Sequence, residues 1–283
     1  MKKSLLMLLA VALVGAGVTP TDVEAATKKK VVAAKKKAPR IAKQINARKL
    51  AQRGASLDDA QHLALQSSAV LVLDQTTGAI LFEKNPNAVL PIASITKLMT
   101  AMVVLDAKPD LKEALVIAQD DVDMVKGTRS RLKVGTHLER EEMLRLALMS
   151  SENRAASALS RHYPGGREAF VAAMNQKART LGLADTRFQD ATGLTAANVS
   201  SPRDLARMVD AAHQYPLIRE FSTTSEGAFS IAGRTQQFRN TNTLVKSPTW
   251  EIGLSKTGYI NEAGKCLVMQ AWLNNKPTII VLL

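Results

Sequence analysis

The chain has 283 residues, of which 46% are hydrophobic and 4% aromatic, and it carries a formal net charge of +13. A chain of this length can bury a full hydrophobic core, and its composition is neither disordered nor collagenous. A single cysteine excludes an internal disulfide, and together with only four scattered histidines it excludes a cysteine-rich zinc site.

The excess positive charge lies in one segment, residues 26–62. It holds eleven Lys and Arg residues against two Asp residues, so residues 63–283 carry only +4. Because the charge of the folded part is ordinary, nucleic-acid binding is not expected. Ala and Val alternate with Lys clusters without a sustained apolar face, which is typical of a solvated linker. The alternative is a weak electrostatic contact of this linker with an anionic cell envelope.

Residues 1–25 have the pattern of a secretory signal peptide. Two lysines precede an apolar run from Leu5 to Val18, and small residues lead to an expected cleavage after Ala25. The apolar run is shorter than the roughly 20 residues that a transmembrane helix needs. We therefore expect an exported protein of the bacterial periplasm, with a retained amphipathic anchor as the alternative.

The folded domain is expected over residues 63–283, and it opens with two strands. Residues 68–74 and 79–83 are rich in β-formers, and a turn over residues 75–78 joins them, which predicts a hairpin. The pattern from Ser94 to Asp106 is helical in length and apolar on nearly every side. Such a helix is normally buried at the centre of a domain.

A helical middle and a second set of strands follow. Helical spacing is found over residues 140–159 and 166–181, and Ser201 caps a further helix that begins with Pro202. Strands at both ends of the chain predict an α/β (α+β) fold with a central antiparallel sheet flanked by helices and an inserted helical lobe. The expected C-terminal strands are 253–259, 266–273 and 277–283.

The chain ends in an apolar strand pattern over residues 278–283. An exposed apolar edge strand would invite aggregation. We therefore expect the natural protein to continue beyond Leu283.

Ser94 and Lys97 lie three residues apart at the start of the predicted buried helix, which puts both side chains on one helical face. A serine hydroxyl is a weak nucleophile until a neighbouring base takes its proton. Lysine becomes such a base when burial and a second cation lower its pKa. A second Ser-x-x-Lys copy, Ser130 to Lys133, lies in a polar stretch without a helix of its own, and we interpret it as a surface loop.

Two further triplets favour the first copy as the catalytic one. The triplet Ser151–Asn153 follows a helical run, and the triplet Lys256–Gly258 lies in a predicted strand. Ser-x-x-Lys and Lys-Thr-Gly with a central Ser-x-Asn triplet are the motif set of penicillin-binding proteins and class A β-lactamases. The sequence resembles the low-molecular-mass penicillin-binding proteins, which are serine D-Ala-D-Ala peptidases.

The likeness covers most of the chain from about Ser67 onward. It implies a β-lactamase/transpeptidase-like fold whose members continue past the last strand into a further helix. It also implies peptidoglycan stem peptides as substrates, β-lactam antibiotics as covalent inhibitors, and catalysis without a metal or cofactor. The segments that carry the likeness are 91–106, 148–156, 162–166, 238–242, 256–259 and 264–269.

The resemblance also implies the role of each motif residue. Ser94 would attack the carbonyl of a penultimate D-Ala, with Lys97 as the general base. Ser151 would relay a proton toward the leaving amine, and the backbone N–H groups of Ser94 and Tyr259 would form the oxyanion hole. Asn153 would orient Lys97, and the residues expected to bind substrate are Asn153, Lys256, Thr257, Gly258 and Tyr259.

A D,D-endopeptidase that cuts peptidoglycan cross-links is the function that the family likeness favours, and a D,D-carboxypeptidase with the same chemistry is the alternative. A β-lactamase needs a carboxylate that activates water, and residues 151–256 contain no Glu-x-x-Leu-Asn loop. A non-catalytic wall-binding or β-lactam-sensing module is disfavoured because every catalytic position is filled. Cys266 is expected to be a buried small hydrophobe.

Overall fold

The computed structural model of the protein describes residues 65–124 and 126–283. The chain divides into two units, residues 1–65 and 66–283, and the second contains the described fold. The predicted signal peptide and basic linker lie outside the described residues. No helix in the described ranges combines the length and the apolar character needed to cross a bilayer.

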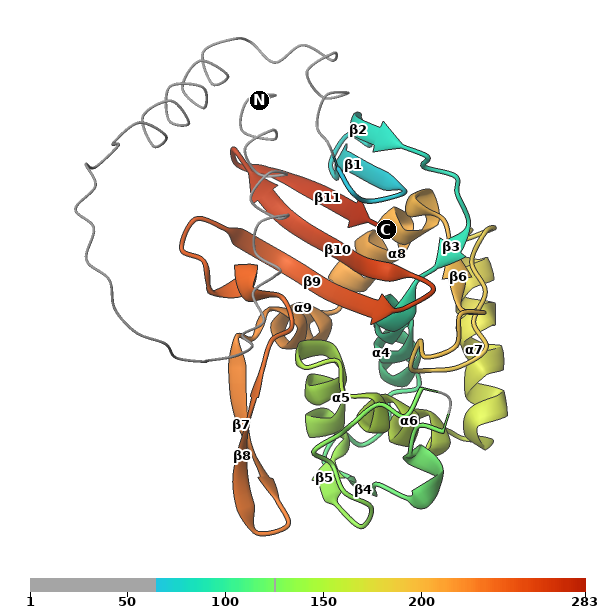
Figure 1. Cartoon of the computed structure of the whole chain (residues 1–283), viewed down its shortest axis with the longest axis vertical. Helices are drawn as coiled ribbons and strands as arrows, with labels where there is room; N and C mark the ends of the chain where they lie inside the picture. Colours follow the sequence, from blue (N-terminus) through green and yellow to red (C-terminus); the bar gives the residue numbers. More distant parts are fainter. Residues whose placement is uncertain (1–64, 125) are drawn as a thin grey trace, which may run out of the picture. The chain divides into compact units, whose positions relative to one another are not determined.

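A five-stranded antiparallel sheet forms the backbone of the fold, with the strand order β2-β1-β11-β10-β9 (Figure 1). Val70 at the start of the domain pairs with Leu282 at its end, so distant segments close the sheet. This confirms the predicted central sheet. The strands are β1 (Val70–Asp74), β2 (Ile80–Lys84), β9 (Glu251–Ile260), β10 (Gly264–Leu273) and β11 (Lys276–Leu282).

The last strand is an interior strand of the sheet. β11 lies between β1 and β10, and residues 278–283 are all buried. The backbone N–H of Leu283 donates to the Ala69 carbonyl at 2.9 Å, and the N–H of Ala69 donates back at 3.1 Å. The apolar run at the end of the chain is therefore not the exposed edge that the sequence suggested, and its composition fits a strand buried on both faces.

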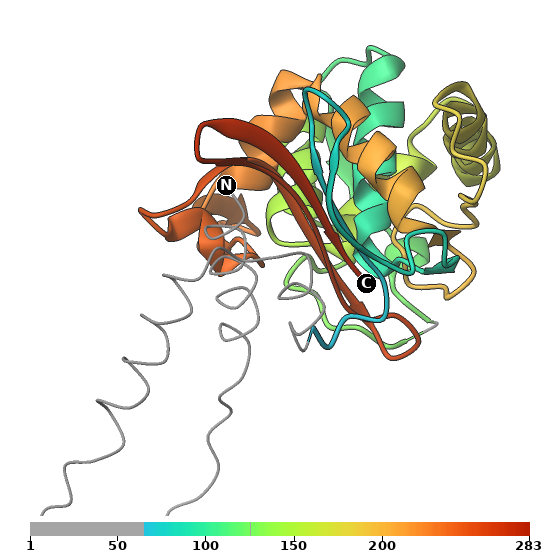
Figure 2. The same cartoon turned by 90° about the horizontal axis from the view of Figure 1, so that it is seen from above.

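Two helices lie directly against one face of the sheet, which is seen edge-on in Figure 2. α8 (Pro202–His213) packs on β1, β10 and β11, and α9 (Pro216–Thr223) packs on β9. The backbone N–H of Asp204 donates to the Ser201 hydroxyl at 3.3 Å, and Pro202 occupies the first turn, as predicted for this cap. The cap fixes where α8 begins under the sheet.

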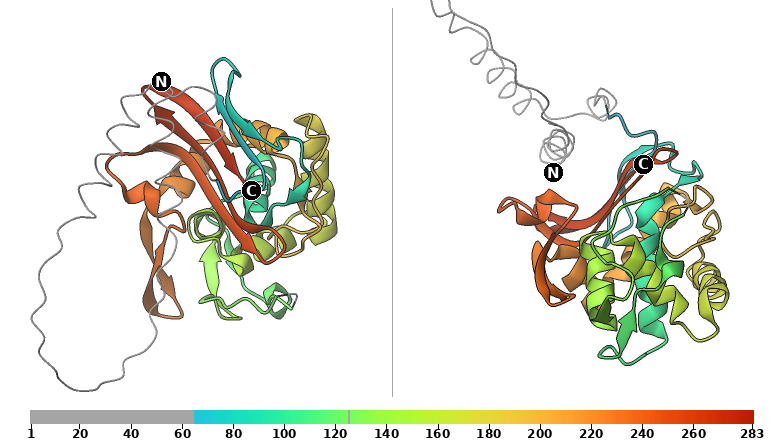
Figure 3. Two further views of the ribbon diagram at one scale, coloured as in Figure 1. Left: turned by 45° about the horizontal axis from the view of Figure 1, so that its top comes forward. Right: turned by 60° about the horizontal axis from the view of Figure 1, so that its bottom comes forward.

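The helix α4 (Thr96–Asp106) lies at the centre of the helical layer (Figures 1 and 3). It contacts α5, α6, α7, α8 and α9, and every residue from Thr96 to Val104 is buried. This confirms the predicted central helix and places its N-terminal end beneath the sheet. The neighbouring helices of the lobe are α5 (Arg140–Met149), α6 (Asn153–Arg161) and α7 (Gly166–Thr180).

The helical pattern over residues 140–159 is two helices rather than one. α5 ends at Met149 and α6 begins at Asn153, and between them Ser151 has a positive φ of 60°. A side chain in this left-handed region costs roughly 1–2 kcal/mol, so the break is held by surrounding contacts. It places Ser151 and Glu152 between the two helices, with Asn153 as the first residue of α6, and turns Ser151 out of the helical path.

A hairpin that the sequence did not predict extends from the sheet region beside α5 (Figures 1 and 3). Its strands are β7 (Glu226–Ile231) and β8 (Arg234–Arg239), and Phe229 meets Phe238 edge to face at 5.5 Å. Most of its other side chains are exposed or half-buried and polar, so the segment lacked a recognisable strand pattern. The remaining short elements are β3 (Leu90–Pro91), β4 (Ala114–Val116), β5 (His137–Glu139), β6 (Val199–Ser200), η1 (Ala93–Ile95), η2 (Gln119–Asp121) and η3 (Thr243–Lys246).

Candidate active site

Ser94 lies in the 3₁₀ turn η1, immediately before α4 and against strand β9. The preceding residue, Ala93, has a positive φ of 46°. Such backbone conformations cost energy and persist only where the surroundings hold them, and they cluster at functional sites. Ser94 is half-buried, so it is neither enclosed in the core nor fully exposed.

Two glycines lie close to the backbone at Ala93 and Ser94. A Cβ at Gly193 would lie 1.9 Å from the Ala93 carbonyl oxygen and 2.9 Å from the Ser94 nitrogen. A Cβ at Gly258 would lie 3.0 Å from the same nitrogen. This close approach explains why the third residue of the Lys-Thr-Gly triplet has no side chain, and it brings strand β9 against Ser94.

Lys97 is completely buried, and its Nζ has three oxygen neighbours. It lies 2.8 Å from Ser94 Oγ, 2.8 Å from Asn153 Oδ1 and 2.6 Å from the carbonyl oxygen of Thr192. The amide and backbone oxygens can only accept hydrogen bonds, whereas the serine hydroxyl can donate or accept. A neutral Lys97 therefore gives its two N–H bonds to Asn153 and Thr192, and its lone pair faces the Ser94 hydroxyl.

Burial lowers the pKa of Lys97 to about 7, because the buried site disfavours the ammonium form. The carboxylates of Asp190 and Glu152 act in the opposite direction and raise that pKa by smaller amounts. A lysine with a pKa near 7 has a substantial neutral fraction at neutral pH. The environment thus meets the requirement for a general base.

Ser151 and Lys256 form a second pair in the same site. Lys256 Nζ donates to Ser151 Oγ at 2.9 Å and to the carbonyl oxygen of Thr257 at 2.8 Å. Burial, together with the nearby charge of Lys97, holds the pKa of Lys256 well below its usual value. Two buried lysines, one on α4 and one on β9, therefore each contact one serine hydroxyl.

Strand β9 carries the third triplet and lies at the edge of the sheet. The Thr257 hydroxyl donates to Thr241 Oγ1 at 2.6 Å, and Thr241 is anchored because its N–H donates to the Met149 carbonyl at 3.1 Å. The Tyr259 side chain is 62% exposed, and its hydroxyl donates to Asn261. The fold thus gathers the three triplets, while the Tyr259 ring faces outward.

The loop that supplies Thr192 was missed from the sequence. The Asp190 carboxylate shapes it by accepting hydrogen bonds from the N–H groups of Thr192 at 2.7 Å, Gly193 at 2.5 Å and Thr195 at 3.1 Å. The segment Asp190-Ala191-Thr192-Gly193 has the residue types of a turn, and this was the only signal in the sequence for the loop. That turn pattern does not predict that the Thr192 carbonyl would contact Lys97.

A family model described as D-alanyl-D-alanine carboxypeptidase, Peptidase S11, matches residues 56–283. The chain belongs to this family. A D-alanyl-D-alanine endopeptidase of Pseudomonas aeruginosa is 53% identical over 221 residues, which are 77% of this chain and 71% of that relative. A D-alanyl-D-alanine endopeptidase of Escherichia coli is 47% identical over 231 residues, or 81% of this chain and 74% of the relative.

Among solved structures, the Streptomyces K15 DD-transpeptidase superposes with a TM-score of 0.71 at 28% identity, covering 77% of this chain and 89% of that one. This confirms the expected transpeptidase-like fold. The expectation of a serine hydrolase of the D-Ala-D-Ala peptidase family is likewise confirmed by the family match and by both curated relatives.

The second Ser-x-x-Lys copy of this peptidase is a loop, as interpreted, although it is not a free surface loop. Ser130 is half-buried, and its hydroxyl donates to Glu152 Oε2 at 2.7 Å, inside the middle triplet. Lys133 is exposed. The same tetrapeptide pattern therefore places its serine against a carboxylate and its lysine in solvent.

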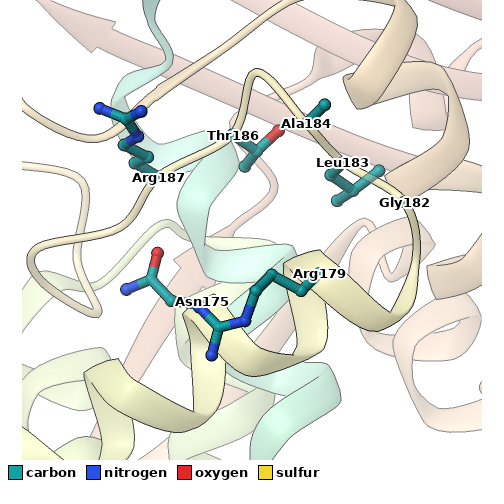
Figure 4. A pocket seen from close by; sticks show the side chains of 7 residues that line it. All are labelled: Asn175, Arg179, Gly182, Leu183, Ala184, Thr186 and Arg187. Atoms are coloured by element: carbon teal, nitrogen blue, oxygen red, sulfur yellow. The ribbon is translucent and has the colours of Figure 1, made fainter.

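A cavity of about 480 Å³ lies at the C-terminal end of α7, outside the group of motif residues (Figure 4). Arg179 and Arg187 line it, and Arg179 donates to Gln176 of its own helix. None of its lining residues belongs to the three triplets. Cys266 is buried as expected, and burial raises the pKa of its thiol to about 11, so it is not a reactive thiolate.

Proposed function

We propose that this peptidase is a D-alanyl-D-alanine endopeptidase that opens peptidoglycan cross-links through an acyl-enzyme on Ser94. The observation that carries the proposal is the 2.8 Å contact between Ser94 Oγ and the Nζ of a completely buried lysine. A hydroxyl next to an amine whose pKa is about 7 is an activated nucleophile.

In the acylation step, Ser94 Oγ attacks the carbonyl carbon of the penultimate D-Ala while its proton passes to the lone pair of Lys97. Asn153 and Thr192 accept the other Lys97 N–H bonds, so the lone pair has one direction available. The oxygen of the tetrahedral intermediate would accept hydrogen bonds from the backbone N–H groups of Ser94 and Tyr259. Such preorganised donors are worth several kcal/mol in enzymes that have been tested, on the order of 3 kcal/mol for one donor.

The leaving amine needs a proton when the peptide bond breaks. Ser151 would supply it through its hydroxyl and recover one from Lys256, whose Nζ donates to Ser151 Oγ at 2.9 Å. Water then attacks the Ser94 ester and gives a proton through Ser151 to the now neutral Lys256, while Lys97 returns its proton to the Ser94 oxygen. The shortened peptide leaves as a carboxylic acid that ionises in solvent, and both lysines and the serine are regenerated. No metal or redox group enters this sequence of steps.

Substrate would bind as an extended chain along the edge strand β9, because an edge strand offers free backbone donors and acceptors. Lys256 and Thr257 would hold a substrate carboxylate, with Gly258 leaving room for the backbone and Tyr259 flanking it. Asn153 would use its second amide N–H for the substrate amide, since its first is bonded to Thr128.

The names of the two curated relatives support endopeptidase activity on cross-linked peptides. The family description supports a D,D-carboxypeptidase as the second candidate. The two activities share all the chemistry of Ser94 and differ in what the groove accepts beyond the scissile bond. Digestion of cross-linked muropeptide dimers and of monomeric pentapeptides separates them, and removal of D-Ala from pentapeptides alone would contradict the endopeptidase proposal.

Peptidoglycan lies outside the cytoplasm, so the proposal places the protein in the periplasm after removal of residues 1–25. The basic residues 26–62 would act as a tether with weak affinity for the anionic envelope. Fractionation of cells that produce the full chain, with N-terminal sequencing of the mature protein, tests both points. A mature protein that retains Met1 would contradict the signal-peptide part.

Fluorescent penicillin tests the acyl-serine mechanism directly. A label that persists for hours on the wild type and is lost in Ser94→Ala supports the proposal. A label that clears within seconds would identify a β-lactamase. A folded wild-type protein that takes no label would indicate a non-catalytic wall-binding module.

A further inference from the structure

The Thr128 hydroxyl lies between a carboxylate and the side-chain amide of Asn153. Thr128 Oγ1 is 2.7 Å from Asp123 Oδ2 and 3.1 Å from Asn153 Nδ2. The Thr128 backbone N–H also donates to Asp123 Oδ2, at 2.8 Å. Thr128 is thus held by two bonds to one carboxylate, and its hydroxyl reaches a residue of the middle triplet.

The direction of each hydrogen bond in this chain follows from its members. A carboxylate can only accept, so the Thr128 hydroxyl gives its single hydrogen to Asp123. The hydroxyl oxygen then has only lone pairs for Asn153, which must present its NH₂ group. The other end of the same amide, Oδ1, is thereby turned toward Lys97 Nζ at 2.8 Å.

The opposite amide orientation would fail at both ends. An Asn153 NH₂ group facing Lys97 would occupy the amine lone pair or meet the hydrogens of an ammonium, and Oδ1 would face the lone pairs of Thr128. At the Lys97 end, which is buried, leaving a polar group without a partner costs roughly 1–3 kcal/mol. The hydroxyl of Thr128 therefore selects the orientation in which Asn153 accepts from Lys97.

We propose that Thr128, held by Asp123, is a positioning residue for the general base: it orients the Asn153 amide and so directs the Lys97 lone pair at Ser94. This inference rests on the proposed acyl-serine mechanism. Its effect acts through the hydrogen-bond chain, since Thr128 itself does not contact Lys97 or Ser94 through any hydrogen bond among the described residues.

The proposal predicts a change in the pH dependence of acylation. The charged groups that face Lys97 are Lys256 on β9, Asp190 on the 183–199 loop and Glu152 before α6, and a Thr128 substitution leaves all three in place. Without the Thr128 hydroxyl the amide is no longer held at that end, and in the molecules whose NH₂ group turns toward Lys97 the ammonium form of Lys97 is disfavoured. The acidic limb of acylation should then move to lower pH, while the plateau rate falls because the lone pair no longer faces Ser94.

The test compares Thr128→Val with Thr128→Ser in the full-length protein. Valine keeps the shape and the backbone N–H bond to Asp123 and removes the hydroxyl, whereas serine restores the hydroxyl. Thr136→Val is the matched control, because Thr136 is buried and its hydroxyl has no hydrogen-bond partner in the described part of the chain. The measured quantity is the second-order rate of acylation by fluorescent penicillin across the neutral pH range.

For Thr128→Val we expect a plateau rate lower by about tenfold or more, within the range for impaired general-base catalysis, and an acidic limb at lower pH. Thr128→Ser should recover most of the rate, and Thr136→Val should match the wild type. Wild-type rate and pH profile in Thr128→Val would overturn the inference, as would an equal loss in both Thr128 variants. A loss of rate with an unmoved acidic limb would also overturn it, because that pattern reports a structural role.

These outcomes are separable from failure of the proposed function. If the wild type takes no label, or if Ser94→Ala is labelled as fast as the wild type, the acyl-serine mechanism itself is wrong. If the wild type is labelled at Ser94 and Thr128→Val behaves like it, only the positioning role is wrong.

Discussion

The two Ser-x-x-Lys segments of this chain have the same spacing and opposite surroundings. Ser94 and Lys97 span the junction of a 3₁₀ turn and the central helix, and Lys97 is completely buried. Ser130 and Lys133 lie in a loop, where the lysine is exposed and the serine hydroxyl donates to Glu152. Spacing alone therefore does not make a nucleophile, because only burial brings the lysine pKa near neutrality.

The first segment also differs from the second in the distant residues that surround its lysine. Its lysine receives partners from 56 and 95 residues further along the chain, Asn153 and Thr192. The serine of the second segment contacts the first site, since the Ser130 hydroxyl donates to Glu152, the central residue of the middle triplet. In the proposed mechanism one copy is the reacting pair, and the serine of the other contacts the middle triplet beside it.

Replacing the two serines gives the largest expected difference. Ser94→Ala should abolish penicillin labelling, because it removes the hydroxyl oxygen to which the acyl group would be attached. Ser130→Ala should lower the acylation rate by less than about tenfold, the scale of one hydrogen bond of 0.5–1.5 kcal/mol. Time courses of fluorescent labelling measure both, and a Ser130→Ala loss as complete as that of Ser94→Ala would reverse the assignment of the two copies.

Replacing the two lysines should give a smaller difference in acylation rate between the two Ser-x-x-Lys copies. Lys97→Met removes the proton acceptor and should slow acylation by about 10²–10⁴-fold, the usual contribution of a general base. Lys133→Met should leave the rate unchanged, because that side chain is exposed. Stopped-flow acylation at neutral pH makes the comparison, and equal rates for both variants would show that Lys97 is not the base.

Glycines beside the two copies test the close packing around Ser94. Gly193 and Gly135 have nearly the same positive φ, 81° and 84°, so alanine at either position carries a similar backbone strain of about 1–2 kcal/mol. Only Gly193→Ala meets backbone atoms, whereas a Cβ at Gly135 meets nothing within 4 Å. We expect Gly193→Ala to lose about 1–3 kcal/mol more in denaturant unfolding, the cost of overpacking. Equal losses would mean that the loop around Gly193 can move away.

The pH dependence of acylation distinguishes the buried Lys97 from the exposed Lys133 by the smallest expected effect. Burial lowers the pKa of Lys97 to about 7, so the neutral, reactive form is lost as pH falls below that value. The acylation rate should drop by about tenfold for each pH unit below the midpoint, since the neutral fraction follows the proton concentration. Lys133→Met should keep the same midpoint. A wild-type acidic limb near the ordinary lysine pKa would contradict a buried base.

The predicted elements with strong local patterns were recovered. The central helix, predicted from Ser94 and observed from Thr96, and the cap at Ser201 follow from neighbouring residues, so the sequence could specify them. The motif triplets were found for the same reason, because each is contiguous in the chain. The sequence placed the Ser151 triplet at a helix end, but the left-handed conformation of Ser151, which surrounding contacts hold, was not predicted.

The hairpin β7–β8 and the supporting residues of the site were harder to predict. Most of the hairpin's side chains are polar and exposed or half-buried, so no strong alternation marked its strands. Thr192 contributes a backbone carbonyl, which carries no sequence signature at all. Thr128 belongs to a loop whose path toward Asn153 depends on a carboxylate five residues earlier.

The sequence by itself determined the family, the residues proposed as nucleophile and base, and the sheet closed by the two ends of the domain. These features rest on residue identity, local periodicity and motif order, which are all written along the chain. The tertiary structure decided which Ser-x-x-Lys copy is buried, that the apolar last strand lies inside the sheet, and which way the Asn153 amide faces. Each of these depends on groups brought together from distant segments, because burial and hydrogen-bond partners are properties of the packed chain.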